Sequence, residues 1–556
     1  MKKGMSVALC LVLAISIVLA GCTKAKENGN AGNNANTTES NTDSKAANAD
    51  TAAEGGASAV SKDGLPIVKD KITLKMVAPK AQLAPNYGEM EIFKRLEEST
   101  NVRVDWDNIP DTDYAEKENL LLASGDLPDA FYGAGFSDYE LITYGKDGTI
   151  LPLEKLIADY APNLSQLLKK RPDIKAAITA PDGRIYGLPT WEENELGTNP
   201  FFHVINKAWL DKLGMKMPET LDEYTDALVA FKTKDPNGNG KDDEIPLSFM
   251  HMNWTADISG LFGAFGMPDN LEHRIVRDGK VIFTATQPEY KEALKYFNEK
   301  WYKQGLIDPE SFTQQAPQYL AKGKTPTETL GSYVWWEIEE VVGADRAKDY
   351  VLVPPLTGPT GKKTIGRGNG GGPGRGTFVI TKANKNPEAT MRWIDQQYEP
   401  YMAAQIHWGP IGVIYEKDAN GKLVNLPIPE GKSMGEYRQQ VAPNGAGVIT
   451  KEDYQTIVDM EPRAKQRKKD LETYYEPYME KENYPNIFFL PEELETINRI
   501  EPELIKFVNT QRAKFIVDGN IDKAWDGYVK QVKEMGLDEL MAVYQKGLDR
   551  YKQAQQ

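Results

Sequence analysis

The spacing of apolar residues from Lys71 onward alternates between the repeat of a strand and that of a helix. KITLKMVA (71–78) places Ile72, Leu74 and Met76 at every second position, as a strand with one buried face does. GEMEIFKRLEEST (88–100) has helical spacing, VRVDWDNI (102–109) reads as a second strand, and YAEKENLLLASG (114–125) as a second helix. Such alternation produces a mainly parallel sheet covered by helices, so the sequence predicts an α/β fold.

The same alternation continues along the chain. PDAFYG (128–133) predicts a third strand and ILPLEKLIADYAPNL (150–164) a further helix, and the pattern restarts with FFHVINKAWLDKLG (201–214). In TLDEYTDALVAFKTK (220–234), Thr220 and Glu223 form a capping box at the start of a helix. EIPLSFM (244–250) and TFVIT (377–381) are strand-like, and the chain from Glu461 onward is mainly helical. Ligands bind beyond the carboxyl ends of parallel strands, which makes Asp129 and Tyr132 early candidates.

The N-terminus has the three parts of a secretory signal. Lysines open MKKGMSVALCLVLAISIVLAGC (1–22), an apolar run from Val7 to Ala20 follows, and small residues precede Cys22. The run is too short and too early for a stable membrane span. LAGC resembles a bacterial lipobox, which implies removal of residues 1–21 and lipidation of Cys22. The alternative is an ordinary signal peptide with an incidental cysteine. Residues 23–64 contain almost no apolar bulk, and residues 22–70, which begin with the lipidated cysteine, should form a disordered linker.

Cysteine usage and charge exclude several classes of function. Cys10 leaves with the signal and Cys22 would carry lipid, so no thiol remains for nucleophilic, metal-binding or redox chemistry. The net charge of −15 makes nucleic acid a poor partner, because phosphate binding needs a basic surface. The one dense basic run, RAKQRKK (463–469), is expected to be the solvated face of a helix.

The stretch DPNGNGKDDEIP (235–246) gathers oxygen-bearing side chains at alternate positions around Gly240. Calcium takes about six to eight oxygen ligands, and a D-x-N-x-N-G turn folds alternate side chains inward. An EF-hand would close with a glutamate at the twelfth position, where this chain has Pro246, so the closing carboxylate would have to come earlier. The alternative is a plain polar turn. The candidate ligands are Asp235, Asn237, Asn239, the carbonyl of Lys241, Asp243 and Glu244.

Several segments resemble a known family. They are GDLPDAF (125–131), GTILPLEKLIADYAPNL (148–164), DGRIYGLP (182–189), residues 205–248 and residues 525–551. These are similar to the lipoprotein solute-binding subunits of carbohydrate ABC importers, extracellular solute-binding protein family 1, and most to the type that includes the alginate-binding proteins. The chain departs from the family pattern at HWGPIGVIY (407–415), where relatives tend to have a more acidic turn.

The resemblance implies an α/β, two-lobed, periplasmic-binding-protein-like fold with hinge crossings and a helix-rich C-terminus. It also implies a structural Ca²⁺ in the oxygen-rich loop, an oligosaccharide ligand, an ABC permease partner and a lipid anchor on the extracellular face of the membrane. We expect a monomer. The expected segments are 1–21 signal peptide, 22–70 lipidated cysteine and linker, 71–190 first part of lobe 1, 191–371 lobe 2 with the calcium loop 235–244, 372–460 return to lobe 1, and 461–556 helical segment packing on the lobes.

Sugar binding commonly uses aromatic rings in concave sites, with polar groups for the hydroxyls. The aromatic candidates are Trp191, Trp254, Trp335, Trp336, Trp408 and Tyr132, and the polar candidates are Asp129, Glu192, Glu193 and Arg375. For each tryptophan the alternative is packing within a lobe. Adjacent strand residues face opposite ways, so we expect only one of Trp335 and Trp336 to reach the ligand. Arg375 could instead anchor the hinge.

Motifs of catalysis fail their contextual tests. GKSMG (431–435) satisfies G-x-S-x-G without a strand feeding it, and GRGNGG (366–371) is not followed by a helix. The histidines His203, His251, His273 and His407 are dispersed. We therefore expect no catalytic residue and a receptor rather than an enzyme. The alternatives are a receptor for peptides or small metabolites on the same fold and, from another class, a surface glycoside hydrolase.

Overall fold

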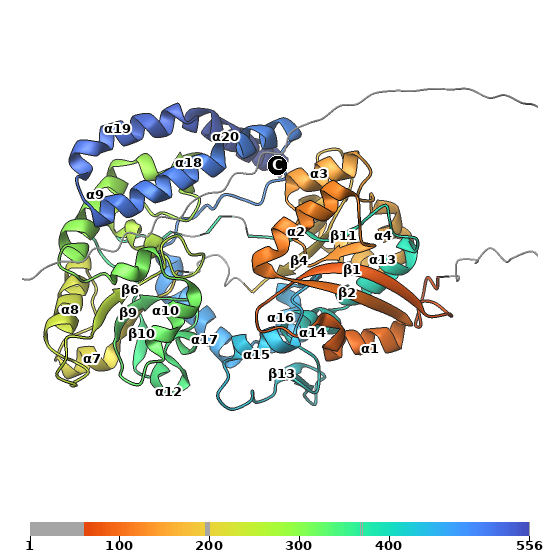
Figure 1. Cartoon of the computed structure of the whole chain (residues 1–556), viewed down its shortest axis with the longest axis horizontal. Helices are drawn as coiled ribbons and strands as arrows, with labels where there is room; N and C mark the ends of the chain where they lie inside the picture. Colours follow the sequence, from red (N-terminus) through yellow and green to blue (C-terminus); the bar gives the residue numbers. More distant parts are fainter. Residues whose placement is uncertain (1–59, 195–200, 367, 370, 555–556) are drawn as a thin grey trace, which may run out of the picture. The chain divides into compact units, whose positions relative to one another are not determined.

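The first predicted strand joins a six-stranded sheet in a computed structural model, which describes residues 60–194, 201–366, 368–369 and 371–554 (Figure 1). The predicted signal peptide, Cys22 and residues 23–59 of the predicted linker lie outside the described residues. The end of the predicted linker is ordered instead, because Ile67 and Val68 are buried in the hydrophobic core of the first lobe and Ile67 N–H donates to the Thr100 carbonyl at 2.9 Å. The strand order is β14-β4-β11-β3-β1-β2, and every strand is parallel to the others except β11. The strands are β1 (Ile72–Lys80), β2 (Val102–Pro110), β3 (Ala130–Tyr132), β4 (Leu188–Glu192), β11 (Gly374–Ile380) and β14 (Gly447–Ile449).

Both faces of this first sheet are buried. Leu74, Met76 and Tyr132 pack into one hydrophobic cluster, whereas Val77 and Phe131 pack into another on the opposite face. The period of two in the strands produces this division, because successive side chains leave a strand on opposite sides. The surrounding helices are α1 (Glu91–Thr100), α2 (Asp111–Ser124), α3 (Asp138–Lys146), α4 (Glu154–Tyr160), α5 (Pro162–Lys170), α6 (Pro172–Ile178), α13 (Pro387–Asp395) and α14 (Pro400–Trp408).

One predicted helix is two helices. The segment 150–164 forms α4 and the start of α5, with Ala161 between them. Pro162 stands at the first position of α5, where its missing N–H costs nothing, but it cannot continue α4. The prediction of a single helix over this segment is therefore wrong.

A second sheet of four strands has the order β10-β5-β9-β6. β5 is antiparallel to β9 and β10, and β6 is parallel to β9. The strands are β5 (His203–Asn206), β6 (Ile245–Ser248), β9 (Leu330–Val334) and β10 (Tyr350–Leu352). The helices of this part are α7 (Lys207–Lys212), α8 (Leu221–Thr233), α9 (Pro288–Tyr296), α10 (Ala316–Gly323), α11 (Ile338–Val342) and α12 (Ala344–Ala347). The predicted capping box of Thr220 and Glu223 opens α8.

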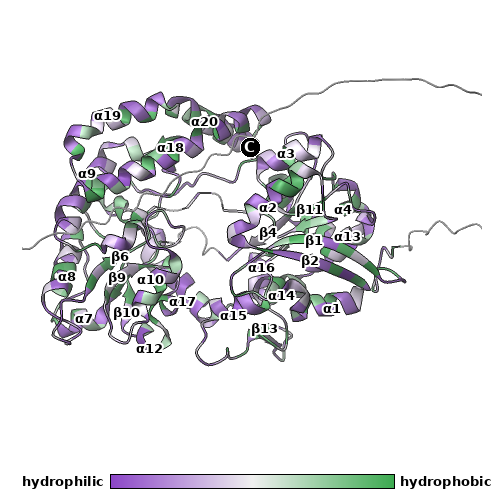
Figure 2. Ribbon diagram, in the orientation of Figure 1, coloured by the Kyte–Doolittle hydropathy of each residue, from purple (hydrophilic) through white to green (hydrophobic). Residues whose placement is uncertain are grey.

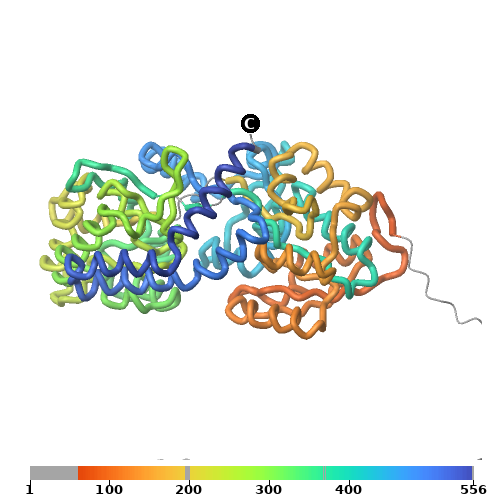
Figure 3. Tube along the Cα trace, turned by 90° about the horizontal axis from the view of Figure 1, so that it is seen from above, coloured from red at the N-terminus to blue at the C-terminus, as the bar shows by residue number. Residues whose placement is uncertain are grey.

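The C-terminal helices complete the core beside the second sheet. Figure 3 shows them as blue tubes running along the green part of the chain. Leu504, Val508 and Trp525 share one hydrophobic cluster with Phe231 of α8. In Figure 2 hydrophobic residues concentrate on the strands of both sheets, while the helices alternate between hydrophobic and hydrophilic faces. These helices are α18 (Pro491–Val517), α19 (Ile521–Glu534) and α20 (Leu537–Ala554), which confirms the predicted helix-rich C-terminus.

The chain passes between the two sheets three times, and the fold is the two-lobed α/β arrangement that the sequence predicts. Along the chain, β4 of the first sheet is followed by β5 of the second, β10 of the second by β11 of the first, and β14 of the first by the segment that holds α16 (Lys451–Thr456) and α17 (Pro462–Asp470) and leads to the C-terminal helices beside the second sheet. The remaining α-helix is α15 (Met434–Val441), and the remaining strands form the hairpins β7 (Arg274–Arg277)–β8 (Lys280–Phe283) and β12 (Tyr415–Lys417)–β13 (Leu423–Asn425).

Candidate ligand-binding site

The end of β4 carries three of the predicted site residues in succession, Trp191, Glu192 and Glu193. Because β1, β2, β3, β4 and β14 are parallel, their carboxyl ends lie at one edge of the first sheet. The next strand along the chain after β4 is β5 of the second sheet. The position is the usual one for a ligand site in an open α/β sheet.

Glu192 accepts hydrogen bonds from three different elements. Its Oε2 accepts from Trp408 Nε1 at 2.8 Å and from the Tyr454 hydroxyl at 2.7 Å, and its Oε1 accepts from Arg438 at 2.7 Å. His407 Nδ1 lies 3.6 Å from the same carboxylate. Burial alone would raise the pKa of Glu192, but Arg438 and His407 outweigh it and lower that pKa to about 2. The carboxylate is therefore charged at neutral pH and joins β4 to α14, α15 and α16.

Arginine covers the ring of Trp408 in this cluster. The guanidinium carbon of Arg438 lies 4.0 Å from the centroid of the Trp408 ring, and its Nε donates to the His407 carbonyl at 2.5 Å. The ring thus has one face against a cation and its N–H bonded to a carboxylate.

A similar group surrounds Trp191. Arg171 lies 5.3 Å from the Trp191 ring centroid and donates to Glu193 at 2.7 Å and to Asp173 at 2.7 Å. Arg171 and Glu193 line a depression of about 570 Å³ on the first lobe, together with side chains of α5 and α16. Residues from the carboxyl edge of the sheet thus form a partly enclosed polar surface.

The predicted tryptophan pair follows β9 of the second sheet, and its two members lie in different surroundings. Trp335 is only 6% exposed, packs against Tyr319 and donates its indole N–H to Glu340 at 2.9 Å. Trp336 is half-buried, and Arg467 of α17 lies 4.9 Å from its ring centroid.

Glu337 binds the arginines of α17 beside Trp336. Arg463 and Arg467 both donate to Glu337, and Arg463 also donates to Glu339. The basic run 463–469 is therefore not merely a solvated helix face, because two of its arginines pair with carboxylates of the second lobe.

Trp254 differs from the other predicted tryptophans because its side chain is 61% exposed. It lies in the loop between β6 and residue 258, beyond the carboxyl end of β6. An indole this exposed offers surface on which a ligand can stack.

The other predicted residues contact protein groups. The Asp129 carboxylate accepts from the backbone N–H of Lys75 at 2.8 Å, which joins β1 to the start of β3. Tyr132 is fully buried and bonds Gln397 at 2.9 Å. Arg375 is 6% exposed and forms an ion pair with Asp138 at 2.7 Å.

Arg375 also donates to the side chain of Asn486 at 2.6 Å and to the carbonyl of Ile487 at 3.0 Å. It therefore ties β11 to the segment that precedes α18, in keeping with the alternative role as an anchor.

The sequence did not point to Arg171, Arg438, Tyr454 or Arg467. Each lies far along the chain from the tryptophan or glutamate it contacts, so no local spacing signals it. Only His407 could have been found locally, because it precedes Trp408 directly.

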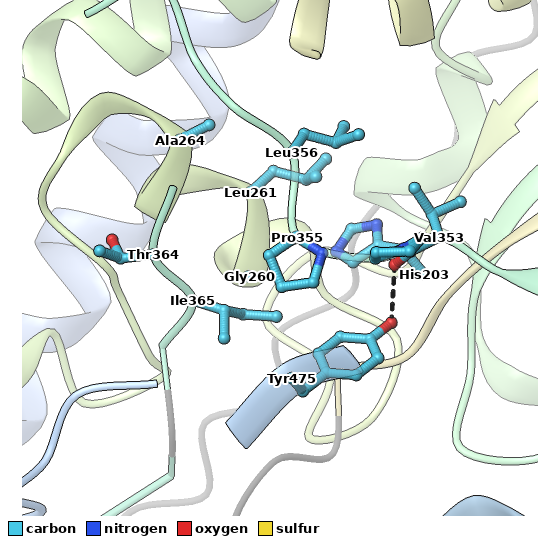
Figure 4. Close-up of a pocket in the computed structure, with 11 residues that line it drawn as sticks. His203, Gly260, Leu261, Ala264, Val353, Pro355, Leu356, Thr364, Ile365 and Tyr475 are labelled. Carbon is cyan, nitrogen blue, oxygen red and sulfur yellow. Dashed lines mark hydrogen bonds between the residues drawn. The ribbon is translucent and has the colours of Figure 1, made fainter. Parts of the chain in front are cut away.

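His203, the first residue of β5, lies close to Val353 and Tyr475 (Figure 4). A small cavity beside it is lined by Val353, Ile365 and Tyr475, and the Tyr475 hydroxyl donates to the Val353 carbonyl at 2.9 Å. The cavity volume of about 10 Å³ suits a single water molecule. Burial lowers the pKa of His203 to about 4, so the imidazole is neutral at physiological pH.

The predicted calcium loop folds around Asp235. Its carboxylate accepts from the backbone N–H groups of Gly238 at 2.9 Å, Asn239 at 3.1 Å and Gly240 at 2.9 Å. The amide nitrogens of Asn237 and Asn239 donate to Asp243 at 2.9 Å each.

Glu244 completes the acidic side of the loop. Its Oε1 is buried without a hydrogen-bond partner among the described residues. Burial, with the charges of Asp235 and Asp243, raises the pKa of Glu244. A carboxylate oxygen without a hydrogen-bond partner, in a loop that carries two further carboxylates, fits a hard cation. Among the described residues, however, no three His, Cys, Asp or Glu side chains are gathered as a metal cluster, so amide and carbonyl oxygens would have to complete the set.

In the part of the chain that the structure describes, none of the helices combines the length and apolarity needed to cross a bilayer.

Comparisons with known proteins agree with this architecture. Residues 80–400 match the family model of bacterial extracellular solute-binding proteins. The chain is 42% identical to the fructooligosaccharide ABC transporter substrate-binding protein FusA of Streptococcus pneumoniae serotype 4, over 87% of this chain and 91% of the relative. It is 28% identical to lipoprotein LipO of Bacillus subtilis, over 85% of this chain and 91% of LipO.

Solved structures give the same result. FusA in complex with kestose matches with a TM-score of 0.83 at 41% identity, covering 87% of this chain and 100% of that chain. An EF-hand mutant of FusA in complex with fructo-nystose matches with the same TM-score, identity and coverage. The alginate-binding protein AlgQ2 without calcium ion matches with a TM-score of 0.67 at 25% identity, over 87% of this chain and 99% of that one. With a family model over more than half of its length and a relative of this similarity, the chain belongs to the bacterial extracellular solute-binding proteins.

Proposed function

We propose that this protein is the substrate-binding subunit of an ABC importer, which captures an oligosaccharide between its two lobes and delivers it to the membrane permease. The observation that carries the proposal is a repeated grouping of one tryptophan, one arginine and one glutamate. The three groups are Trp191–Arg171–Glu193, Trp408–Arg438–Glu192 and Trp336–Arg467–Glu337.

The chemistry of these groups suits a sugar. The C–H face of a pyranose or furanose ring stacks on an indole, while a hydroxyl needs both a donor and an acceptor. Arginine supplies the donors and glutamate the acceptor, side by side. Trp254, the most exposed of the predicted tryptophans, would add an accessible platform for stacking.

The pairing of charges favours a neutral sugar. Arg171, Arg375 and Arg438 each already have a carboxylate partner, as do Arg463 and Arg467. A uronic acid chain such as alginate would have to displace these carboxylates and then face them, which costs electrostatic energy. FusA binds fructooligosaccharides, which are uncharged. Its sequence is 42% identical to this chain, whereas that of the alginate-binding protein AlgQ2 is 25% identical.

A binding panel tests this proposal. Calorimetry on the soluble chain should detect kestose, nystose or another neutral oligosaccharide, and should find weaker or no binding of oligouronates and peptides. Preferential binding of a peptide or small metabolite would favour the first alternative. New reducing ends after incubation with candidate polysaccharides would overturn the transport function in favour of a glycoside hydrolase. Members of the family bind solutes, which supports a protein without catalytic activity.

For the loop 235–244 we propose a structural Ca²⁺. Asp235, Asn237, Asn239, the Lys241 carbonyl, Asp243 and Glu244 would hold it, with the two amides turned so that their oxygens face the ion. The bound ion would neutralise the carboxylates and fix the end of α8 against β6. The EF-hand of FusA supports this proposal.

The location is proposed from the N-terminus. We infer that residues 1–21 are removed, that Cys22 is lipidated and that the part of the linker before the buried Ile67 tethers the lobes to the outer face of the cell membrane. The similarity to LipO, a lipoprotein, supports this arrangement. The lobe limits 71–190, 191–371, 372–460 and 461–556 likewise stay proposals, as does the monomeric state.

A further inference from the structure

The loop 249–257, here called the Trp254 loop, carries an exposed indole on a segment without helix or strand. A mobile loop would lose conformational entropy on binding, so a binding platform needs support from a rigid element. The source of that support can be followed through the hydrogen bonds of the loop.

Asp257, which is fully buried, holds the middle of the Trp254 loop. Its Oδ2 accepts from the backbone N–H of Met252 at 2.6 Å, and its Oδ1 accepts from the backbone N–H of Ser259 at 2.8 Å. Met252 has a φ of +57°, a conformation that a residue with a long side chain adopts only when its surroundings impose it. The bond to Asp257 therefore maintains a strained turn two residues before Trp254.

Asp257 is in turn held by the C-terminal helix. Arg512 of α18 donates to Asp257 Oδ1 at 2.7 Å, and both side chains have no exposed surface. The same guanidinium contacts Ser259 Oγ at 3.2 Å and the sulfur of Met252 at 3.0 Å. Arg512 thus contacts both the residue that fixes the turn and the turn itself.

A second residue of α18 supports the same loop. Asn509, one turn before Arg512, accepts from two histidines: its backbone carbonyl accepts from His251 Nε2 at 3.0 Å, and its side-chain oxygen accepts from His273 Nε2 at 2.8 Å. Residues three apart lie on one face of a helix, so Asn509 and Arg512 both reach the base of the Trp254 loop from the same face of α18. Away from this surface α18 is packed into the hydrophobic core through Leu504 and Val508.

We propose that the buried Asp257–Arg512 pair is a positioning device through which helix α18 holds the Trp254 loop in the conformation that presents its indole to the sugar. The inference rests on the proposed function, because it takes Trp254 as a ligand contact. It adds that a C-terminal helix sets the affinity of the site without touching the ligand.

The test uses the soluble chain labelled with 5-fluorotryptophan. Its ten tryptophans should give ten ¹⁹F resonances, and the one lost in Trp254→Phe belongs to Trp254. Arg512→Lys keeps the charge but cannot reach Asp257, Ser259 and Met252 together. We expect it to shift and sharpen the Trp254 resonance and to weaken binding of kestose about threefold to tenfold. If Arg512→Lys does not fold, Ser259→Ala takes its place. This milder change removes one contact of Arg512 and should shift the Trp254 resonance and weaken kestose binding in the same direction.

Two control experiments distinguish an effect through Trp254 from a general effect on the fold. In a Trp254→Ala background, Arg512→Lys should cause no further loss of affinity. Arg499→Lys, which alters an exposed arginine of the same helix paired with Glu539, should change neither the resonance nor the affinity. An unmoved Trp254 resonance, or an equal loss of affinity with and without Trp254, would overturn the inference. Failure of the proposed function would look different, because the unmodified chain would then bind none of the sugars.

Discussion

Glu192 connects the predicted site residues on the first lobe. Its carboxylate receives N–H or O–H groups from Trp408, Arg438 and Tyr454, so three separate segments depend on one charge. Hydrogen bonds to a buried charged group are stronger than those between neutral groups. The cluster therefore fixes the orientation of the Trp408 ring, whereas Trp254 depends on its loop.

The difference in exposure between Trp254 and Trp191 leads to a prediction. Trp254→Ala should weaken binding of a neutral oligosaccharide about tenfold, equivalent to about 1.4 kcal/mol, while the melting temperature stays unchanged. Trp191→Ala should weaken binding and also lower the melting temperature, because Trp191 packs on the core of the first lobe and under Arg171. Calorimetry and thermal unfolding of both variants measure this. Full affinity in either variant would remove that tryptophan from the site.

Glu340 provides a pH-dependent prediction. Burial, with the charge of Glu337, raises its pKa to about 7 despite the N–H of Trp335 and the charge of Arg467, and Glu436 of α15 adds to the rise. The folded state therefore prefers the protonated acid. Its contribution to stability is complete below the unfolded pKa near 4.5 and is lost as the pH rises through about 7.

Glu340→Gln, which resembles the protonated acid, should remove this loss. We expect the variant to be more stable than the unmodified chain at pH 8 and nearly equal to it at pH 4.5, in urea unfolding at both values. Glu503→Gln, at an exposed position of α18, is the control and should leave the pH dependence unchanged. A variant whose stability falls between pH 5 and 8 as steeply as before would show that Glu340 does not titrate there.

Among the helices and strands, the features that depend only on neighbouring residues could be predicted from the sequence. The capping box at Thr220, the strand β1 and the calcium-like loop could be read from neighbouring residues, because caps, period and turn residues act over a few positions. The break between α4 and α5 was missed, although Pro162 marks it. Arg438 and Arg467 could not be predicted, because their partners Glu192 and Glu337 are brought to them only by the tertiary fold.

The loop between α8 and β6 allows a test of metal binding. Removal of Ca²⁺ with a chelator should lower the melting temperature, and added Ca²⁺ should restore it. An ion at about 100 times its Kd contributes about 2.7 kcal/mol. Asp235→Asn should abolish the response, because Asp235 organises the loop through three backbone N–H groups. Asp242→Asn, an exposed neighbour outside the ligand set, should respond as the unmodified chain does. A melting temperature that changes with neither chelator nor added Ca²⁺ would indicate a plain polar turn.

The two lobes touch around α15, which has no fully buried residue. Gly435 lies against Glu340 and Trp336 of the second lobe, and Glu436 lies 3.7 Å from Lys324. Arg438, one turn later, contacts Glu192 and Trp408 of the first lobe. A change in the angle between the lobes must therefore alter the contacts of this short helix. A ligand can drive such a change only by binding one arrangement of the lobes better than the other.

Movement of the lobes can be measured directly, because neither cysteine of the sequence lies among the described residues. With Cys22 replaced by serine, single cysteines at Lys155 of α4 and Asp211 of α7 would carry a donor and an acceptor dye; both side chains are exposed, at 88% and 62%. Addition of a neutral oligosaccharide should change the transfer efficiency, with a midpoint equal to the Kd from calorimetry. Trp254→Ala should move both midpoints together, since the closed state is populated only through the binding energy of the sugar. A pair of dyes on α4 and α13, both of the first lobe, should report no change. If the sugar binds by calorimetry while the efficiency between lobes stays constant, capture does not require closure, and the ligand must be held by a single lobe.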